Sequence, residues 1–374
     1  MRVLMTGGGT AGHIYPALAV AGEVVASGRD EVAFVGTPSG LEARLVPEAG
    51  IPFFGLPARG FDRARPLSLL IAVAVAFWST LKAVGILRRL EPDVVVGFGG
   101  YVSIPVGLAA VVRHTPLVIH EQNSVPGLAN RLLSRWACRV AVTYEGSSAY
   151  LKHPGRSVVT GNPVRPAVLG ASRDRGRRIV DAENGDVVLL VFGGSRGARH
   201  INRAVVAASE RILALENVRV LHIAGRAEYD SASADLAAHG GEAGGRWSVH
   251  DYIEDMGSCI AGADLIVARA GATSLAEITA IGRAAVLVPY PYATDDHQTL
   301  NAKAVSERGG AVMIEDSALD GPDFASEVVR LLADATSRAT MAAASERLGR
   351  PEAARLVAAV ISEAVGSSAK EGTE

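Results

Sequence analysis

The fold is decided at the start of the chain, by Arg2-Val-Leu-Met-Thr-Gly-Gly-Gly-Thr-Ala-Gly-His-Ile-Tyr-Pro16. The apolar run from Val3 to Thr6 predicts a short buried strand, and the residues after the glycines predict a helix to about Ser27. Glycine permits a tight turn between them and lets a ligand approach the bare backbone. The helix directs its unpaired N–H groups and the positive end of its dipole at the same point. We therefore expect a strand, an anion-binding loop and a helix, with His13 where the helix begins.

The glycine spacing has a common alternative interpretation. Gly7, Gly9 and Gly12 match G-x-G-x-x-G, which after a first strand most often marks a dinucleotide site. Such a site usually has an acidic residue at the end of the second strand, where it binds ribose. The second expected strand, 31–35, is followed instead by Gly-Thr-Pro. This disfavours an NAD-dependent oxidoreductase, and the ionisable His13 favours the wall of a catalytic cleft.

Length and composition narrow the class of protein. The 374 residues suit two domains, and the 49% of apolar residues are enough for sizeable cores. A net charge of -2 does not favour a nucleic-acid partner. Cys138 and Cys259 match no metal-binding spacing, so we expect small buried hydrophobes in a reduced cytosol. Neither end resembles a signal peptide.

Strand-like apolar runs alternate with helix-length segments throughout, which predicts α/β architecture with parallel sheets. The expected strands are 3–6, 31–35, 53–56, 94–98, 117–120, 139–143 and 157–160, then 187–192, 218–223, 247–250, 265–268, 285–289 and 311–314.

The second half of the chain opens like the first, with a strand, a glycine turn and a helix over 188–199. A change in composition near 162–186 marks the junction between the two halves. We therefore expect two Rossmann-like domains, 1–163 and 164–350, facing each other across a cleft, with ligands beyond the carboxyl ends of the strands. A last helix, 351–365, could pack back on the first domain, and the tail 367–374 is expected to be frayed.

The segment Pro66–Leu81 carries no charge and has basic residues on both sides. It is short for a membrane-spanning helix, which needs about 20 apolar residues. One interpretation is an ordinary buried helix. The other is a helix whose outer face touches the bilayer through Ile71, Val75 and Trp78, with the flanking basic residues against anionic headgroups.

Polar motifs follow several of the expected strands. Ser195, inside Gly193-Gly-Ser-Arg-Gly197, suits phosphate contact, although a tight turn would look the same. Glu277 would fall about one and a half turns into a helix and could bind two vicinal hydroxyls of a ribose, or be a solvated glutamate. His120-Glu-Gln-Asn123 and Asp295-Asp-His-Gln298 suit a sugar or a catalytic site, or polar helix starts. No Asp-x-Asp occurs anywhere in the sequence, and no His/Cys metal constellation stands out.

Taken in order, these motifs resemble the MurG family, UDP-N-acetylglucosamine–N-acetylmuramyl-(pentapeptide) pyrophosphoryl-undecaprenol N-acetylglucosamine transferase. The matching stretches are Gly8–His13 with Pro16, Gly97–Tyr101, His120–Asn123, Gly161–Arg165, Gly193–Ala198, Arg269–Glu277, and Gln298 with Asn301. The resemblance implies a GT-B fold and inverting transfer of GlcNAc from UDP-GlcNAc to the C4 hydroxyl of lipid I, giving lipid II for peptidoglycan. It implies no cofactor and no metal, and a peripheral place on the cytoplasmic side of the cell membrane, against an anionic surface.

The resemblance also implies which residues bind each substrate. The donor contacts that it implies are Thr10, Ala11, Gly12, Asn123, Arg165, Ser195, Ile253, Ala272, Thr273, Ser274, Leu275, Ala276, Glu277 and Gln298. Glu277 would bind the ribose and Ile253 the uracil. Gly8, Gly9 and Tyr101 would face the acceptor.

Inverting transfer needs a base to take the acceptor proton and a group to hold the charge of the leaving UDP. Helix N-termini and an arginine are expected to hold that charge. His13 at a helix N-terminus is biased toward neutral imidazole, which can accept a proton at pH 7, and Glu121 is the rival base. Three other functions stay open: a UDP-GlcNAc 2-epimerase-like enzyme, an NAD-dependent oxidoreductase, and a non-catalytic nucleotide-sugar sensor at the membrane.

Overall fold

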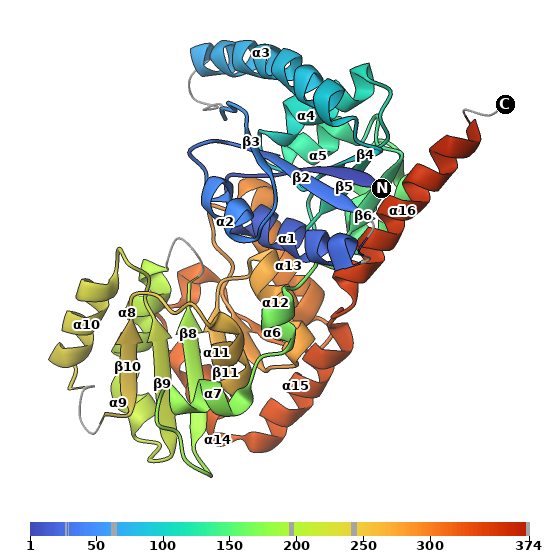
Figure 1. Ribbon diagram of the computed structural model, residues 1–374. Helices are drawn as coiled ribbons and strands as arrows, with labels where there is room; N and C mark the ends of the chain where they lie inside the picture. Colours follow the sequence, from blue (N-terminus) through green and yellow to red (C-terminus); the bar gives the residue numbers. More distant parts are fainter. Residues whose placement is uncertain (27, 29, 61–65, 194–197, 241–244, 372–374) are drawn as a thin grey trace. The chain divides into compact units, whose positions relative to one another are not determined.

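The computed structural model describes residues 1–26, 28, 30–60, 66–193, 198–240 and 245–371 (Figure 1). The chain divides into two compact units. One comprises Met1–Arg165 with Pro351–Glu374, and the other comprises Pro166–Arg350. Each unit has a parallel sheet between two layers of helices, so the α/β prediction is confirmed.

The described residues of the first unit form a seven-stranded sheet in the order β3-β2-β1-β4-β5-β6-β7. Its strands are β1 (Arg2–Thr6), β2 (Glu31–Gly36), β3 (Phe53–Gly55), β4 (Val94–Gly97), β5 (Leu117–Glu121), β6 (Arg139–Val142) and β7 (Ser157–Val159). Strand order reverses beside β1, whose Thr6 pairs with Gly97 of β4. Such reversal points are where α/β sheets bind ligands, beyond the carboxyl ends of the strands.

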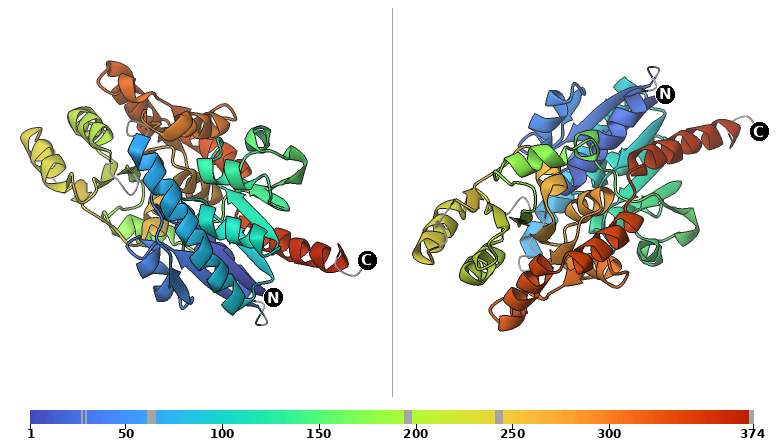
Figure 2. Two further views of the ribbon diagram at one scale, coloured as in Figure 1. Left: turned by 90° about the horizontal axis from the view of Figure 1, so that it is seen from above. Right: turned by 90° about the horizontal axis from the view of Figure 1, so that it is seen from below.

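Both faces of this sheet are covered, which is why its strands are continuous apolar runs. Val3 and Met5 pack toward α1 (Ala11–Ala26), α2 (Glu42–Glu48) and α16 (Ala353–Glu371). Leu4 packs toward the other layer, α3 (Pro66–Leu90), α4 (Ser103–Val112) and α5 (Leu128–Leu133), because successive strand residues point to opposite faces. Seen from above, α3 lies across this sheet (Figure 2, left). The short helices η1 (Glu145–Tyr150) and η2 (Pro154–Arg156) follow β6.

Helix α16 brings the end of the chain back to the first unit. Its Val357 and Ile361 are buried in the same core as Met5 and Val20, and α16 packs along α1 (Figure 1). The helix continues to Glu371, so the prediction of a frayed tail from residue 367 was wrong for 367–371.

The described residues of the second unit form a six-stranded sheet in the order β10-β9-β8-β11-β12-β13. Its strands are β8 (Val187–Phe192), β9 (Val218–Ile223), β10 (Trp247–His250), β11 (Leu265–Ala268), β12 (Ala285–Leu287) and β13 (Val312–Met313). Strand order reverses beside β8, as it does beside β1 in the first unit.

The helices of the second unit form two layers. One contains α8 (Arg199–Ala207), α9 (Ser209–Leu213), α14 (Pro322–Ala333) and α15 (Ala335–Leu348), and the other contains α11 (Met256–Gly262), α12 (Ala272–Ile281) and α13 (His297–Ser306). The remaining helices are α6 (Pro166–Leu169), α7 (Arg173–Arg178), α10 (Tyr229–Ala238), η3 (Thr294–Asp296) and η4 (Asp316–Ala318).

Candidate functional site

The loop between β1 and α1 places His13 in the first turn of α1. Gly9 has φ +88°, a conformation that glycine adopts without steric cost. The imidazole Nδ1 of His13 lies 2.8 Å from the carbonyl oxygen of Gly8. Because a carbonyl oxygen only accepts hydrogen bonds, this Nδ1 carries a proton. The neutral ring therefore has its lone pair on Nε2, the nitrogen that could act as a base.

The loop after β4 packs against the loop after β1. Gly99 and Gly100 have φ +97° and +82°. A Cβ atom on Gly100 would overlap the Gly8 carbonyl, and one on Gly99 would stand 3.1 Å from Nε2 of His13. Glycine at both positions therefore allows the close approach of the two backbones. Tyr101, expected at the acceptor, follows directly and is exposed.

Glu121, the rival base, ends β5 and is buried. One carboxylate oxygen accepts hydrogen bonds from the backbone and side-chain nitrogens of Asn123, at 2.9 and 3.4 Å. The other accepts from the Gly127 backbone N–H at 3.1 Å and from Asn130 Nδ2 at 2.8 Å. These contacts use Glu121 to hold the loop after β5.

His120 is also buried, and its two ring nitrogens are used inside the protein. Nε2 lies 3.1 Å from the Gly161 carbonyl oxygen, to which it donates, and Nδ1 accepts from Gln122 Nε2 at 3.1 Å. Burial lowers the pKa of His120 to about 4, so the ring is neutral at pH 7. His120 therefore orders the end of β5 and is not available as a base.

Arg165 stands at the end of the first unit. Its guanidinium carbon lies 3.9 Å from the centre of the Tyr15 ring, which belongs to α1. A cation this close to an aromatic face is attracted by the ring. Among the donor contacts implied by the family motifs, Thr10, Ala11, Gly12 and Arg165 thus come from the β1–α1 loop and a residue stacked on α1.

In the second unit, helix α12 begins after Gly271 and carries the expected donor residues Ala272 to Glu277 in its first turns. Glu277 is largely buried. Ile253 follows β10 and packs against the core that includes Ala268. Ser195 lies outside the described residues, so the loop after β8 is not characterised.

Gln298 lies in the first turn of α13, and its orientation is set by the backbone. Its Oε1 accepts a hydrogen bond from the Tyr290 N–H at 2.9 Å. The side-chain NH2 of Gln298 is then the group it can offer to a ligand. Asn301, one turn later, is buried and donates from Nδ2 to the Ala270 carbonyl at 3.2 Å.

An ionic cluster at the carboxyl end of this sheet was missed by sequence reasoning. Asp316 accepts from Arg269 Nη1 at 2.5 Å and from His200 Nδ1 at 2.8 Å, and His200 Nε2 lies 3.1 Å from Asp320 Oδ1. The hydrogen bond to Asp316 raises the pKa of His200. Burial opposes ionisation of Asp316, but the bonds from His200 and Arg269 outweigh it and lower the pKa of Asp316. These residues come from separate segments, and no spacing pattern relates them.

Helix α3 has one buried and one exposed apolar face. Ala72, Ala83 and Leu87 are buried, and Ser79 Oγ donates to the Pro57 carbonyl at 2.6 Å. The exposed set, called here the apolar face of α3, is Leu69, Leu70, Ile71, Val73, Phe77, Trp78 and Leu81, with Leu70 67% and Trp78 64% exposed. An exposed set of this size marks an interaction surface.

Two expectations about this helix need correction. Val75 is only partly exposed, because a turn of 100° per residue places it between the exposed Ile71 and the buried Ser79. The helix is also longer than its uncharged part, since it continues through Lys82 to Leu90. By length and composition alone, Ser68–Leu90 is long and apolar enough to cross a membrane, with mean hydropathy 2.0.

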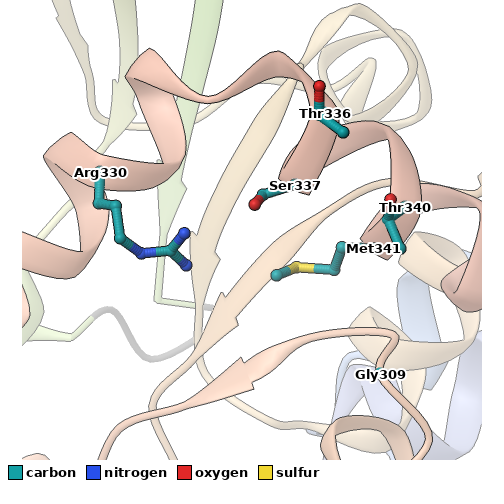
Figure 3. Close-up of a pocket in the computed structure, with 6 residues that line it drawn as sticks. All are labelled: Gly309, Arg330, Thr336, Ser337, Thr340 and Met341. Atoms are coloured by element: carbon teal, nitrogen blue, oxygen red, sulfur yellow. The ribbon is translucent and has the colours of Figure 1, made fainter.

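Outside these regions, a depression of about 270 Å³ lies in the second unit, lined by Gly309, Arg330, Thr336, Ser337, Thr340 and Met341 (Figure 3). The Arg330 guanidinium is paired with Glu327 at 2.7 Å. The depression contains none of the residues expected at the site.

Comparison with known proteins decides the family. The glycosyltransferase family 28 N-terminal domain model matches residues 3–142, and the C-terminal domain model of the same family matches 188–357. A Desulforamulus reducens protein is 42% identical over 356 residues, covering 94% of this chain and 96% of the relative. A Lacticaseibacillus casei protein is 43% identical over 363 residues, covering 96% and 98%. Both are named UDP-N-acetylglucosamine–N-acetylmuramyl-(pentapeptide) pyrophosphoryl-undecaprenol N-acetylglucosamine transferase.

Solved structures agree with this comparison. The crystal structure of Acinetobacter baumannii MurG has a TM-score of 0.75 and 31% identity, covering 97% of this chain and 99% of that one. The chain belongs to the MurG family. The GT-B fold expected for a MurG-family chain is thereby confirmed. A Neisseria meningitidis UDP-GlcNAc 2-epimerase bound to UDP-GlcNAc has a TM-score of 0.68 at 14% identity, over 97% of this chain and all of that one, which shows a shared fold alone.

Proposed function

We propose that this chain transfers GlcNAc from UDP-GlcNAc to the C4 hydroxyl of MurNAc in lipid I, giving lipid II and UDP. The observation that carries the proposal is identity of 42–43%, along at least 94% of the chain, to enzymes named for this transfer. In the reaction, the C4 oxygen of the acceptor bonds to C1 of GlcNAc on the face opposite the phosphate. The bond from C1 to the UDP oxygen breaks, UDP leaves with the electron pair, and a base takes the hydroxyl proton.

His13 is the base that the hydrogen bonds favour. Its Nδ1 is occupied by the Gly8 carbonyl, which leaves Nε2 to accept the proton. The positive end of α1 favours the neutral ring that can do so. Glu121 instead accepts four hydrogen bonds from N–H groups of the loop after β5, so its lone pairs are already directed at the protein.

The second unit is the proposed donor site. The N-terminal N–H groups of α12, with its positive dipole end, would stabilise the charge that develops on the leaving UDP. Glu277, in the same helix, would accept hydrogen bonds from the ribose hydroxyls. Gln298 would donate from its NH2 to a sugar hydroxyl, because its carbonyl is already bonded to Tyr290.

The apolar face of α3 is the proposed membrane contact. Lys82, Arg88 and Arg89 are exposed in the second half of the same helix, where they can meet anionic headgroups. The buried residues Ala83 and Leu87 join α3 to the core of the first unit, so crossing a bilayer would give up that packing. Association with the cytoplasmic face of the cell membrane, with α3 lying on the surface, is therefore favoured over spanning.

Release of UDP tests the proposed reaction. The purified protein is incubated with UDP-GlcNAc, with and without a lipid I analogue, and UDP is followed over time. UDP release that requires the analogue, together with a disaccharide product, is the expected result. Formation of a 2-epimer without the analogue, or turnover of NADH, would contradict the transfer reaction and favour one of the alternative enzymes.

A further inference from the structure

Glu42, the first residue of α2, is a buried carboxylate with no part in the reaction described above. Its relative exposure is 0%. Oε1 accepts the Thr37 backbone N–H at 2.9 Å and the Thr37 hydroxyl at 2.6 Å. Oε2 is also enclosed, and it has no hydrogen-bond partner among the residues that the structure describes. Burying a carboxylate in this way costs free energy, which indicates that its packing serves a purpose.

Three glycines surround the Glu42 side chain. A Cβ atom on Gly8 or Gly40 would overlap its carboxylate, and one on Gly36 would overlap its Cγ. None of the three has a positive φ, so their backbones would accept other residues. They are therefore glycines because the Glu42 side chain occupies the space that a Cβ would need.

The Gly8 peptide is enclosed on its other sides as well. Val102 Cγ1 lies 3.3 Å from the position of a Gly8 Cβ, and Gly100 packs so closely that its own Cβ would overlap the Gly8 carbonyl oxygen. That same carbonyl receives the hydrogen bond from His13 Nδ1 at 2.8 Å. The contacts thus run without a gap from Glu42 through Gly8 to the imidazole.

We propose that Glu42 is a positioning residue for His13. By packing against Gly8, it holds the Gly8 carbonyl where it fixes the imidazole with Nδ1 protonated and Nε2 available to take a proton. The proposal rests on the proposed role of His13 as the base. Glu42 itself touches neither substrate nor a reacting atom; it acts through Gly8.

Replacement of Glu42 tests this directly. Glu42→Ala is expected to lower kcat about tenfold to a hundredfold, because a displacement of about 1 Å at a reacting group can cost that much. The KM for UDP-GlcNAc is expected to stay the same, and the acid limb of the kcat–pH profile to shift. Glu42→Gln keeps the shape and an oxygen for Thr37, so it is expected to restore most of the activity. Glu48→Ala is the matched control, since Glu48 ends the same helix, exposed and paired with Arg44 at 3.1 Å.

A steric exchange provides a second, independent test. Gly8→Ala alone is expected to abolish most activity because its methyl group overlaps the carboxylate. In the double variant Gly8→Ala, Glu42→Ala, the new methyl group occupies space that the carboxylate has left. The double variant is therefore expected to be more active than Gly8→Ala. A double variant no better than Gly8→Ala would overturn the proposed packing.

The nitrogen NMR shifts of His13 separate this proposal from the base assignment. In the wild type, Nδ1 is expected to be the protonated nitrogen of the neutral ring, and in Glu42→Ala the two tautomers are expected to mix. If His13→Ala keeps full turnover, the base assignment fails, while the shifts still report on Glu42. If His13→Ala is inactive and Glu42→Ala changes neither kcat, pH profile nor shifts, only the Glu42 proposal fails. Should Glu42→Ala not fold, Glu42→Asp replaces it with the same expected loss of kcat, and a wild-type kcat would refute the proposal.

Discussion

His13 and Glu121 differ, at the residue scale, in what their polar atoms already contact. His13→Ala is expected to lower kcat roughly 10²–10⁴-fold, the usual contribution of a general base. Glu121→Gln is expected to lower thermal stability, because its NH2 group would face the N–H donors of Gly127 or Asn123. Steady-state kinetics and thermal melting of both variants check this.

The exposed His153 supplies a control for the His13 experiment. His153→Ala is expected to keep wild-type turnover and melting temperature. If His13→Ala retained near-full turnover while Glu121→Gln lost it without loss of stability, the base would have to be reassigned to Glu121.

Helix α3 determines, at the element scale, how the protein meets a membrane. Replacing Leu70, Phe77 and Trp78 with Ser removes about 1 kcal/mol of burial from each, which together weakens vesicle binding about a hundredfold. UDP-GlcNAc binding is expected to be unchanged, since these side chains point away from the core. Co-sedimentation with anionic vesicles measures the effect.

Val112→Ser is the matched control for the α3 variant, because Val112 is 63% exposed but lies at the end of α4. It is expected to bind vesicles like the wild type. Unfolding of the triple variant would contradict the assignment of these residues to an exposed face, and unchanged vesicle binding would contradict the membrane contact.

Acid stability is a property of the whole molecule, because each unit buries one neutral histidine. Burial lowers the pKa of His120, and likewise of His222, to about 4, below the unfolded value of 6.5. Between these pH values the unfolded chain binds more protons, so the free energy of unfolding falls as pH drops from 6.5 toward 4. At pH 5 each histidine is expected to cost about 2 kcal/mol.

Calorimetry at pH 7 and pH 5 checks the acid effect. His222 donates from Nε2 to Asn202 Oδ1 at 3.0 Å, so His222→Gln can keep a donor there while removing the titrating group. The variant is expected to lose less stability between pH 7 and pH 5 than the wild type. His239→Gln, at an exposed position, is expected to lose as much as the wild type. Equal losses in all three proteins would contradict the role of His222.

Much of the fold follows from local pattern. Every expected strand is present, and runs such as 218–223 match to the residue, because strands covered on both faces must be apolar throughout. The α1 helix and the position of His13 follow from the glycine loop. The ends of α3 and α16 were less well predicted, because a helix stops where its packing partners do, and those partners are distant in sequence.

The sequence by itself determined the order of strands, the two glycine openings and the family, because apolar runs, turn residues and motif order are local properties of the chain. Only the tertiary structure decided which nitrogen of His13 is protonated, that Glu121 is already fully bonded, that Glu42 stands behind Gly8, and which side of α3 is exposed. Hydrogen-bond partners and burial depend on residues that are brought together from separate strands and loops, and no spacing along the chain specifies them.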